Sequence, residues 1–216
     1  MHNDLILPVP VLTIRQGRIT PALQQHNMLL QVILKDLGYP DELVLSAESE
    51  DSAAQAITEH LPNLIFYRVA DHSNLHFLPQ IKSLYPSCCL ISIHENKAAP
   101  SEILKTVQNG ADAYLLSDTP AEQLFQQIKC ILRGGAVLHP EFAKLLQEQL
   151  TSKHNQEINL IFNSVEIQII EQISQPSSEV QAALALNLSE YQVYSFIKNI
   201  FRKIYILHKN TEAAAE

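Results

Sequence analysis

The sequence predicts an α/β domain built on a parallel five-stranded sheet, followed by a small all-helical domain. Two observations carry this prediction. Short, continuously apolar runs alternate with helical patterns through the first two thirds of the chain, which is typical of parallel strands covered on both faces. From residue 159 onward every pattern is helical, with apolar residues three or four positions apart.

Five apolar runs predict strands over Val9–Ile14, Leu43–Ser46, Leu64–Tyr67, Cys89–Ile93 and Ala113–Leu116. The intervening patterns predict helices over Pro21–Leu37, Asp51–His60, Leu75–Tyr85, Ser101–Asn109 and Pro120–Arg133. Thr119 and Pro120 are a capping residue and a first-turn proline for the last of these helices, and Gly134 and Gly135 end it. Five strand–helix units in this order predict a flavodoxin-like (βα)5 fold.

The rest of the chain is predicted to be helical. A helix over Pro140–Leu150 leads into the polar, aperiodic residues 151–157, which predict a linker. Three further helices are expected, and the tight turn before the last of them predicts a helix-turn-helix: Ser164–Ser174, Ser178–Leu186 and Ser189–Ile206. We therefore expect an α/β domain over residues 1–139, a linker helix and linker over 140–158, and a helix-turn-helix domain over 159–216.

Composition narrows the class of protein. Hydrophobic residues make up 46% of the 216 positions and charged residues 18%, which suits globular domains. The formal charge of −8 provides no general attraction to nucleic acid. No apolar run approaches the ~18 residues of a membrane span, and we expect no membrane association. Cys88, Cys89 and Cys130 lack metal-binding spacing, which indicates reduced thiols in a cytoplasmic protein.

Two segments resemble one known family. Gly110–Asp118 is similar to the fifth strand of a receiver domain from NarL/FixJ-type response regulators, with Tyr114 at that family's switch aromatic. The tail resembles a LuxR-type helix-turn-helix. Leu186–Glu190 aligns with the family's motif Leu-Gly-Ile-Ser-Glu, and Asn199–Ile204 aligns with its motif Asn-Ile-Tyr-Arg-Lys-Leu. Two unrelated motifs in the family's order and spacing make the resemblance specific. It implies a transcriptional regulator and not an enzyme.

The resemblance also shows where this chain departs from the family's phosphorylation chemistry. Arg68 occupies the position of the family's phospho-acceptor carboxylate. Arg15 and Gln16 occupy the positions of the acids that hold Mg²⁺, and Ser117 replaces the lysine that pairs with the phosphoryl group. A guanidinium cannot accept a phosphoryl group, and its charge repels a divalent cation. The residues therefore predict a phosphorylation-independent pseudo-receiver with no cofactor and no metal.

Other positions in this pocket leave alternatives open. The hydroxyl expected after the fourth strand is Ser92, or His94 replaces it. Arg68 either locks a signalling state by pairing with Asp71 or Glu95, or merely fills a pocket released from its chemistry. His72 and His76 have the spacing of helical metal ligands, but no third ligand is apparent in the sequence.

The last predicted helix carries the candidate DNA contacts. Lys198, Arg202 and Lys203 recur at intervals of four and five, and we expect them to share one broad face. The full set of candidate DNA-binding residues is Gln192, Tyr194, Ser195, Lys198, Asn199, Arg202 and Lys203. The first hypothesis is therefore a DNA-binding regulator.

The charge of the tail favours an alternative hypothesis. Residues 159–216 hold fewer basic than acidic side chains, and Val165 and Val180 replace basic residues of the family. The sequence also stops where relatives continue into a fourth helix that pairs two DNA-binding domains, so we expect a homodimer or heterodimer formed through the receiver domain. The alternative is a protein-interaction module that pairs with another regulator and does not bind DNA.

Overall fold

A computed structural model describes residues 9–15, 21–69, 75–95, 98–151, 161–175 and 179–215 of the chain. Its sheet is parallel, in the strand order β2-β1-β3-β4-β5. The strands are β1 (Val11–Ile14), β2 (Val44–Ala47), β3 (Leu64–Arg68), β4 (Cys89–His94) and β5 (Ala113–Leu116). The flavodoxin-like (βα)5 prediction is confirmed, and each strand lies within two residues of its predicted bounds.

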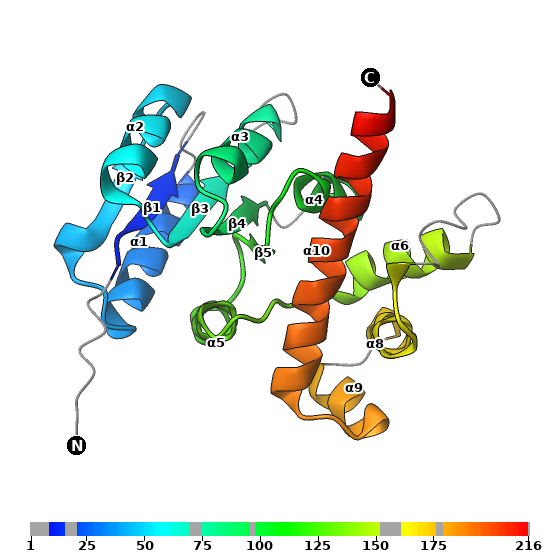
Figure 1. Ribbon diagram of the computed structural model, residues 1–216. Helices are drawn as coiled ribbons and strands as arrows, with labels where there is room; N and C mark the ends of the chain where they lie inside the picture. Colours follow the sequence, from blue (N-terminus) through cyan, green and yellow to red (C-terminus); the bar gives the residue numbers. More distant parts are fainter. Residues whose placement is uncertain are drawn as a thin grey trace, which may run out of the picture.

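Helices cover both faces of this sheet (Figure 1). They are α1 (Pro21–Asp36), α2 (Glu50–His60), α3 (Phe77–Leu84), α4 (Pro100–Gln108) and α5 (Ala121–Leu132), with a 3-10 turn over Asp41–Leu43. Alternate residues of β3 enter different clusters: Leu64 and Phe66 pack with α1, whereas Ile65 and Tyr67 pack with α2 and α3. Burial on both faces explains why the strands are continuously apolar.

The predicted capping residue of α5 is wrong. The residue that precedes α5 is Pro120, which makes no side-chain capping hydrogen bond, so Thr119 is not the capping residue. Thr119 instead lies in the preceding turn, where its backbone N–H donates to the Leu116 carbonyl oxygen at 3.2 Å.

The helical part consists of α6 (Pro140–Thr151), α8 (Ser164–Ser174), α9 (Glu179–Leu186) and α10 (Glu190–Ala215). The bounds of α8 match the prediction, and a reciprocal capping box of Asn163 and Glu166 accounts for its start. Helix α10 does not end at Ile206 as predicted, since no glycine or proline occurs between Glu190 and Ala215. Despite its length, neither α10 nor any other helix in the described ranges is apolar enough to cross a membrane.

The α/β part and the helical part share one hydrophobic core. A single cluster of buried residues extends from α1 and β5 through α6 to α8 and α10. At its centre lie the fully buried rings of Tyr114 (β5), Phe142 (α6) and Phe201 (α10), with centroids 5.7 to 6.0 Å apart. Helix α10 also packs along α4 (Figure 1). The expected boundary at residues 158 and 159 lies outside the described residues, so the domain limits stay predictions.

A buried histidine connects α1 to the end of β5. His26 is 2% exposed, and its Nδ1 lies 3.0 Å from the carbonyl oxygen of Ser117. Because a carbonyl oxygen only accepts, Nδ1 carries the proton in this contact. Burial lowers the pKa of His26 below its ordinary value of 6.5, although the hydrogen bond to Ser117 acts in the opposite direction. The imidazole is therefore neutral in the folded protein near pH 7.

Replacing Phe201 with alanine should destabilise the whole chain. The missing ring would leave a cavity at the junction of β5, α6 and α10, and Phe→Ala changes in cores cost about 3–5 kcal/mol. Since both parts share this core, urea unfolding followed by circular dichroism should show a single transition at lower urea. Arg202→Ala, an exposed change on the same helix, should alter the free energy of unfolding by less than about 0.5 kcal/mol. A Phe201→Ala loss below about 1 kcal/mol would contradict the shared core.

The neutral state of His26 predicts a loss of stability at mildly acidic pH. The unfolded chain takes up a proton near pH 6.5 and the folded chain only at lower pH, so the free energy of unfolding falls as pH decreases through this window. One such proton contributes a slope of at most about 1.4 kcal/mol per pH unit. His26→Asn keeps an N–H donor for the Ser117 carbonyl oxygen. This variant should make the free energy of unfolding less dependent on pH at and below pH 6.5. The exposed Met28→Gln, which alters no ionisable group on the same helix, should leave the pH profile unchanged; equal flattening by both variants would exclude His26 as the cause.

Candidate functional site

The carboxyl ends of β1 and β3 carry two neighbouring arginines. Arg68 is the last residue of β3 and is 4% exposed. Arg15 directly follows β1, and the register pairs Ile14 with Tyr67, so the two arginines end adjacent strands. Burial lowers the pKa of Arg68, the Glu95 carboxylate raises it, and the charge of Arg15 lowers it again. This edge of the sheet therefore carries cationic side chains where the resemblance implies a phospho-acceptor and metal-binding acids.

Ser92 and His94, the two alternatives for the pocket hydroxyl, belong to one buried network on β4. The hydroxyls of Ser92 and Thr106 (α4) lie 3.1 Å apart. Nε2 of His94 lies 3.0 Å from the Ser92 hydroxyl and 3.2 Å from the Thr106 hydroxyl. The Thr106 hydroxyl donates to the carbonyl oxygen of Ile103 at 2.8 Å. The network connects β4 to α4. Sequence reasoning missed Thr106, because a threonine inside an amphipathic helix has no distinguishing pattern.

Ser117 lies at the same edge of the sheet, immediately after β5. Its backbone N–H donates to the His94 carbonyl oxygen at 2.8 Å, and its own carbonyl oxygen meets His26. The described residues contain no group of three or more His, Cys, Asp or Glu side chains placed to hold a metal ion. His76, a metal candidate in the sequence, pairs instead with Glu50 at 3.3 Å. The predictions for Gln16, Asp71 and His72 and for linker residues 152–158 fall outside the described residues.

Helix α10, the predicted recognition helix, presents three different faces, as expected for 3.6 residues per turn. A buried apolar face accompanies its packing on α8 and α9: Val193, Ile197, Ile200 and Ile204. A second face contacts the α/β part and α6: Tyr194, Lys198, Phe201 and Tyr205. The third is exposed to solvent: Gln192, Ser195, Asn199 and Arg202.

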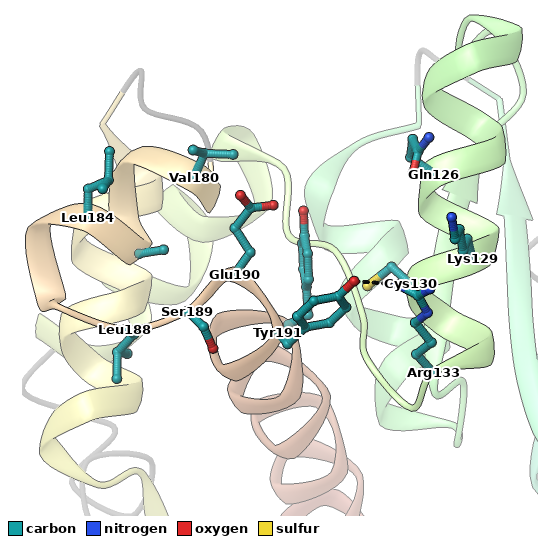
Figure 2. Close-up of a pocket in the computed structure, with 12 residues that line it drawn as sticks. Gln126, Lys129, Cys130, Arg133, Val180, Leu184, Leu188, Ser189, Glu190 and Tyr191 are labelled. Carbon is teal, nitrogen blue, oxygen red and sulfur yellow. Dashed lines mark hydrogen bonds between the residues drawn. The ribbon is translucent and has the colours of Figure 1, made fainter.

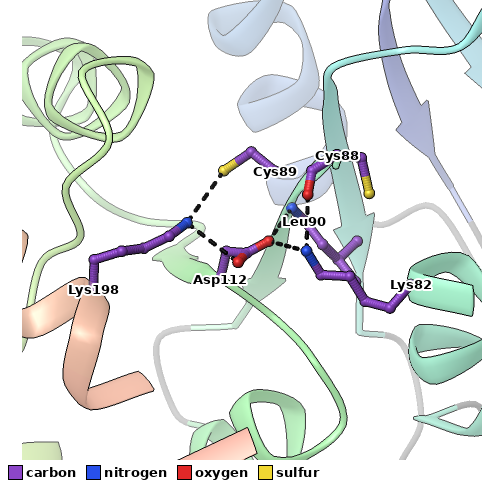
Figure 3. A network of polar contacts seen from close by, with 6 residues as sticks. All are labelled: Lys82, Cys88, Cys89, Leu90, Asp112 and Lys198. Carbon is purple, nitrogen blue, oxygen red and sulfur yellow. Dashed lines mark hydrogen bonds and ion pairs between the residues drawn. The ribbon is translucent and has the colours of Figure 1, made fainter. Parts of the chain in front are cut away.

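An ion network connects the second face to the sheet (Figure 3). The Asp112 carboxylate, just before β5, pairs with Lys198 Nζ of α10 at 3.3 Å and with Lys82 of α3. It also accepts the backbone N–H of Leu90 at 2.9 Å. Lys198 Nζ lies 3.8 Å from the sulfur of Cys89 as well. One carboxylate thus holds a lysine from each part of the protein.

The backbone brings α10 still closer to the chain between α5 and α6. The Tyr194 carbonyl oxygen, which lies within α10, accepts a hydrogen bond from the backbone N–H of Ala136 at 3.1 Å. A Cβ on Gly135 would lie 2.8 Å from the Tyr194 Cβ and 2.8 Å from the Cys130 sulfur, which is too close for a real contact. Only glycine therefore permits this approach of the helix.

The beginning of α10 also contacts Arg133, the residue that follows α5 (Figure 2). The guanidinium of Arg133 lies over the Tyr191 ring, 5.3 Å from its centroid, and donates to the Tyr191 hydroxyl. Arg133 therefore contacts the first turn of α10 by both a cation–π interaction and a hydrogen bond. Figure 2 shows the side chains of α5 facing α9 and this first turn across a cleft.

The expectation that Lys198, Arg202 and Lys203 share one face is wrong. Lys198 points to Asp112, Lys203 pairs with the buried Glu166 carboxylate of α8 at 2.6 Å, and Arg202 is exposed. Consecutive helix residues are separated by about 100°, so positions 202 and 203 cannot point the same way. The amide oxygen of Gln192 accepts from the backbone and hydroxyl of Ser189, at the start of the helix. The candidate DNA-binding residues are therefore divided between internal contacts and solvent.

Comparison with known proteins relates both parts of the chain to one class of regulator. No protein-family model matches the chain. It is 24% identical over 221 residues to the transcriptional regulatory protein DegU of Brevibacillus brevis, a match that covers 90% of each protein. It is 35% identical over 106 residues to a nitrate/nitrite response regulator homologue of Haemophilus influenzae, covering 49% of this chain and 50% of that protein.

Among solved structures, the RcsB response regulator of Salmonella typhimurium matches with a TM-score of 0.52 at 12% identity, over 96% of this chain and 100% of RcsB. That likeness shows the fold, while the sequence relatives are transcriptional regulators and response regulators. The homologues of this chain are therefore NarL/FixJ-type response regulators, and the chain has the fold of RcsB, a parallel α/β domain followed by a helical domain.

Proposed function

We propose that this protein is a DNA-binding transcriptional regulator whose receiver domain works without aspartyl phosphorylation. The observation that carries the proposal is the position of α10, the predicted recognition helix, against the receiver domain through Tyr194 and Lys198. DegU of Brevibacillus brevis and YdfI of Bacillus subtilis are transcriptional regulatory proteins, which supports a role in transcription for this chain.

The arginine pair at the sheet edge supports independence from phosphorylation. Phosphoryl transfer to a receiver needs a carboxylate nucleophile and a bound Mg²⁺, which acidic oxygens hold. Arg68 ends β3 and Arg15 follows β1, so both neighbouring positions carry guanidinium groups. Their charge disfavours Mg²⁺ and provides no acceptor atom. The receiver would then act through its conformation and its contacts with α10.

The contacts of α10 suggest how DNA binding would be regulated. Asp112 and DNA phosphates compete for the same cation, because Lys198 cannot pair with both. Contact between Tyr194 and the α5–α6 connection likewise excludes DNA from that side of the helix. Docking of α10 on the receiver domain therefore lowers the apparent affinity of the protein for DNA, and release of α10 raises that affinity. In the docked state α10 and α6 pack against α4, so this part of the receiver domain is not free for the dimerisation expected from the sequence.

A second candidate function is a protein-interaction module that does not bind DNA. It is favoured by the pairing of Lys198 with Asp112 and of Lys203 with Glu166, which leaves Arg202 as the exposed base among the candidate DNA contacts. Binding to the DNA backbone normally relies on several free cations. DNA-binding experiments separate the two functions.

Incubation with acetyl phosphate and Mg²⁺ should produce no phosphorylated aspartate. The expectation follows from the guanidinium groups at the acceptor and metal positions. Intact-protein mass spectrometry measures the result, with a homologous receiver that retains its acceptor aspartate treated in parallel as the positive control. A phosphoryl group mapped to any aspartate of this chain would refute the pseudo-receiver assignment.

Weakening the docking of α10 should strengthen binding to DNA. Asp112→Asn removes the charge that holds Lys198, and Gly135→Ala forces Tyr194 away from the α5–α6 connection. Each variant should bind a long duplex at low salt about 5-fold or more tightly than the parent chain, measured by gel retardation. Two unrelated contacts are altered, so a shared effect points to docking.

Two controls make this experiment decisive. Asp41→Asn removes an exposed charge far from α10 and should bind DNA like the parent chain. Arg202→Ala, combined with Asp112→Asn, should weaken binding and reduce the salt dependence by the equivalent of about one phosphate contact. Absence of binding by all variants at low salt would exclude the regulator and leave the interaction module.

A further inference from the structure

A small cavity lies at the junction of the receiver and helix-turn-helix domains. It has a volume of about 330 Å³ and is bounded by α5, the α5–α6 connection, the start of α9 and Tyr194 of α10. It adjoins the larger cleft of Figure 2 and shares Gln126, Cys130 and Tyr194 with it. Pockets for small ligands begin at about this size and are common where domains meet.

A buried amide in the wall of this cavity lacks a hydrogen-bond donor. Gln127 lines the cavity and is 6% exposed, and its Oε1 has no hydrogen-bond partner in the described part of the protein. Leaving a buried polar atom unpaired is unfavourable, and native structures contain few such atoms. Protein atoms cover this oxygen, so an N–H group of a bound molecule would reach it once the Gln127 amide rotates toward the cavity.

The charge of the cavity wall is negative. Glu179, the first residue of α9, lines the cavity and accepts a hydrogen bond from the backbone of Leu138. Burial raises the pKa of Glu179, and the nearby Glu190 carboxylate acts in the same direction. No lysine or arginine lines the cavity, and Glu179 makes no ion pair among the described residues. A cationic ligand would compensate this charge.

The remaining walls suit a small apolar body. Val137, Leu138 and Pro140 line the cavity together with Tyr194. His139 also borders it, and burial lowers the pKa of this histidine, so its ring is neutral near pH 7. The cavity thus combines a carboxylate, an unpaired acceptor and apolar walls, a combination that fits an organic cation better than an anion or a metal ion.

We propose that this cavity binds a small organic cation with N–H donors, such as an amidine or protonated amine attached to a flat apolar group, as an effector. Gln127 belongs to the receiver domain, whereas Glu179 and Tyr194 belong to the helix-turn-helix domain. A ligand that contacts both sides stabilises the docked arrangement and lowers affinity for DNA. This regulatory effect rests on the proposed function, whereas ligand binding itself does not.

Benzamidine is a suitable probe, because it joins an amidinium to a flat ring. Isothermal titration calorimetry on the full chain without DNA should show saturable binding with a Kd of about 1 mM or lower. Benzamide, which has the same shape without the charge, should bind about tenfold more weakly or worse, and benzoate should not bind. Glu179→Gln retains an acceptor for Leu138 but removes the charge, and should weaken benzamidine binding at least about tenfold.

Two further variants keep this test independent of folding. Gln127→Leu removes the unpaired acceptor and should also weaken benzamidine binding, whereas Glu171→Gln, an exposed acid on α8, should not. Circular dichroism checks that each variant is folded. Non-saturable binding, equal binding of the three probes, or unchanged affinity in folded Glu179→Gln would each overturn the proposed site.

The role as an effector has its own readout. Saturating benzamidine should weaken DNA binding by the parent chain and not by Glu179→Gln. If benzamidine binds as expected but no variant retards DNA, the proposed ligand site is supported and the proposed function is refuted. If DNA binds but benzamidine does not, the proposed function stands and the effector site is refuted.

Discussion

The packing of the Tyr114, Phe142 and Phe201 rings determines where α10 lies. These residues come from β5, α6 and α10, and each ring is fully buried. Aromatic rings bury large areas and prefer tilted or edge-to-face contacts, so this cluster brings three elements together with a defined orientation. The backbone N–H of His139 donates to the Tyr114 hydroxyl at 2.9 Å, which satisfies the polar end of that ring. The ion pair of Lys198 and the close approach at Gly135 depend on this placement.

The same cluster connects the sheet edge with α10. Tyr114, at the family's switch position, makes an edge contact with His94, whose ring joins Ser92 and Thr106. On its other side Tyr114 contacts Phe201 of α10. This packing is a physical connection between the buried network on β4 and α10. The cavity beside Glu179 lies along the same junction between domains.

Local sequence predicted most elements because each has a local cause. The strands are continuous apolar runs, and α8 begins directly after Asn163, whose side chain caps it. The end of α10 could not be placed, since no glycine or proline marks it. The partners of Lys203 and Lys198 could not be predicted either, because Glu166 and Asp112 are distant in sequence and no periodicity connects them.

The sequence by itself determined the fold class, the order and approximate positions of strands and helices, and the kind of side chain at the ends of β1, β3 and β5. These follow from periodicity, capping and residue chemistry, which act over a few residues. Only the tertiary structure decided which face of α10 meets the receiver. Two of its faces carry large apolar side chains, and both Phe201 and Ile200 are suited to burial. The choice between them depends on complementary packing with β5 and α6 and on the space left at Gly135, which are properties of the assembled fold.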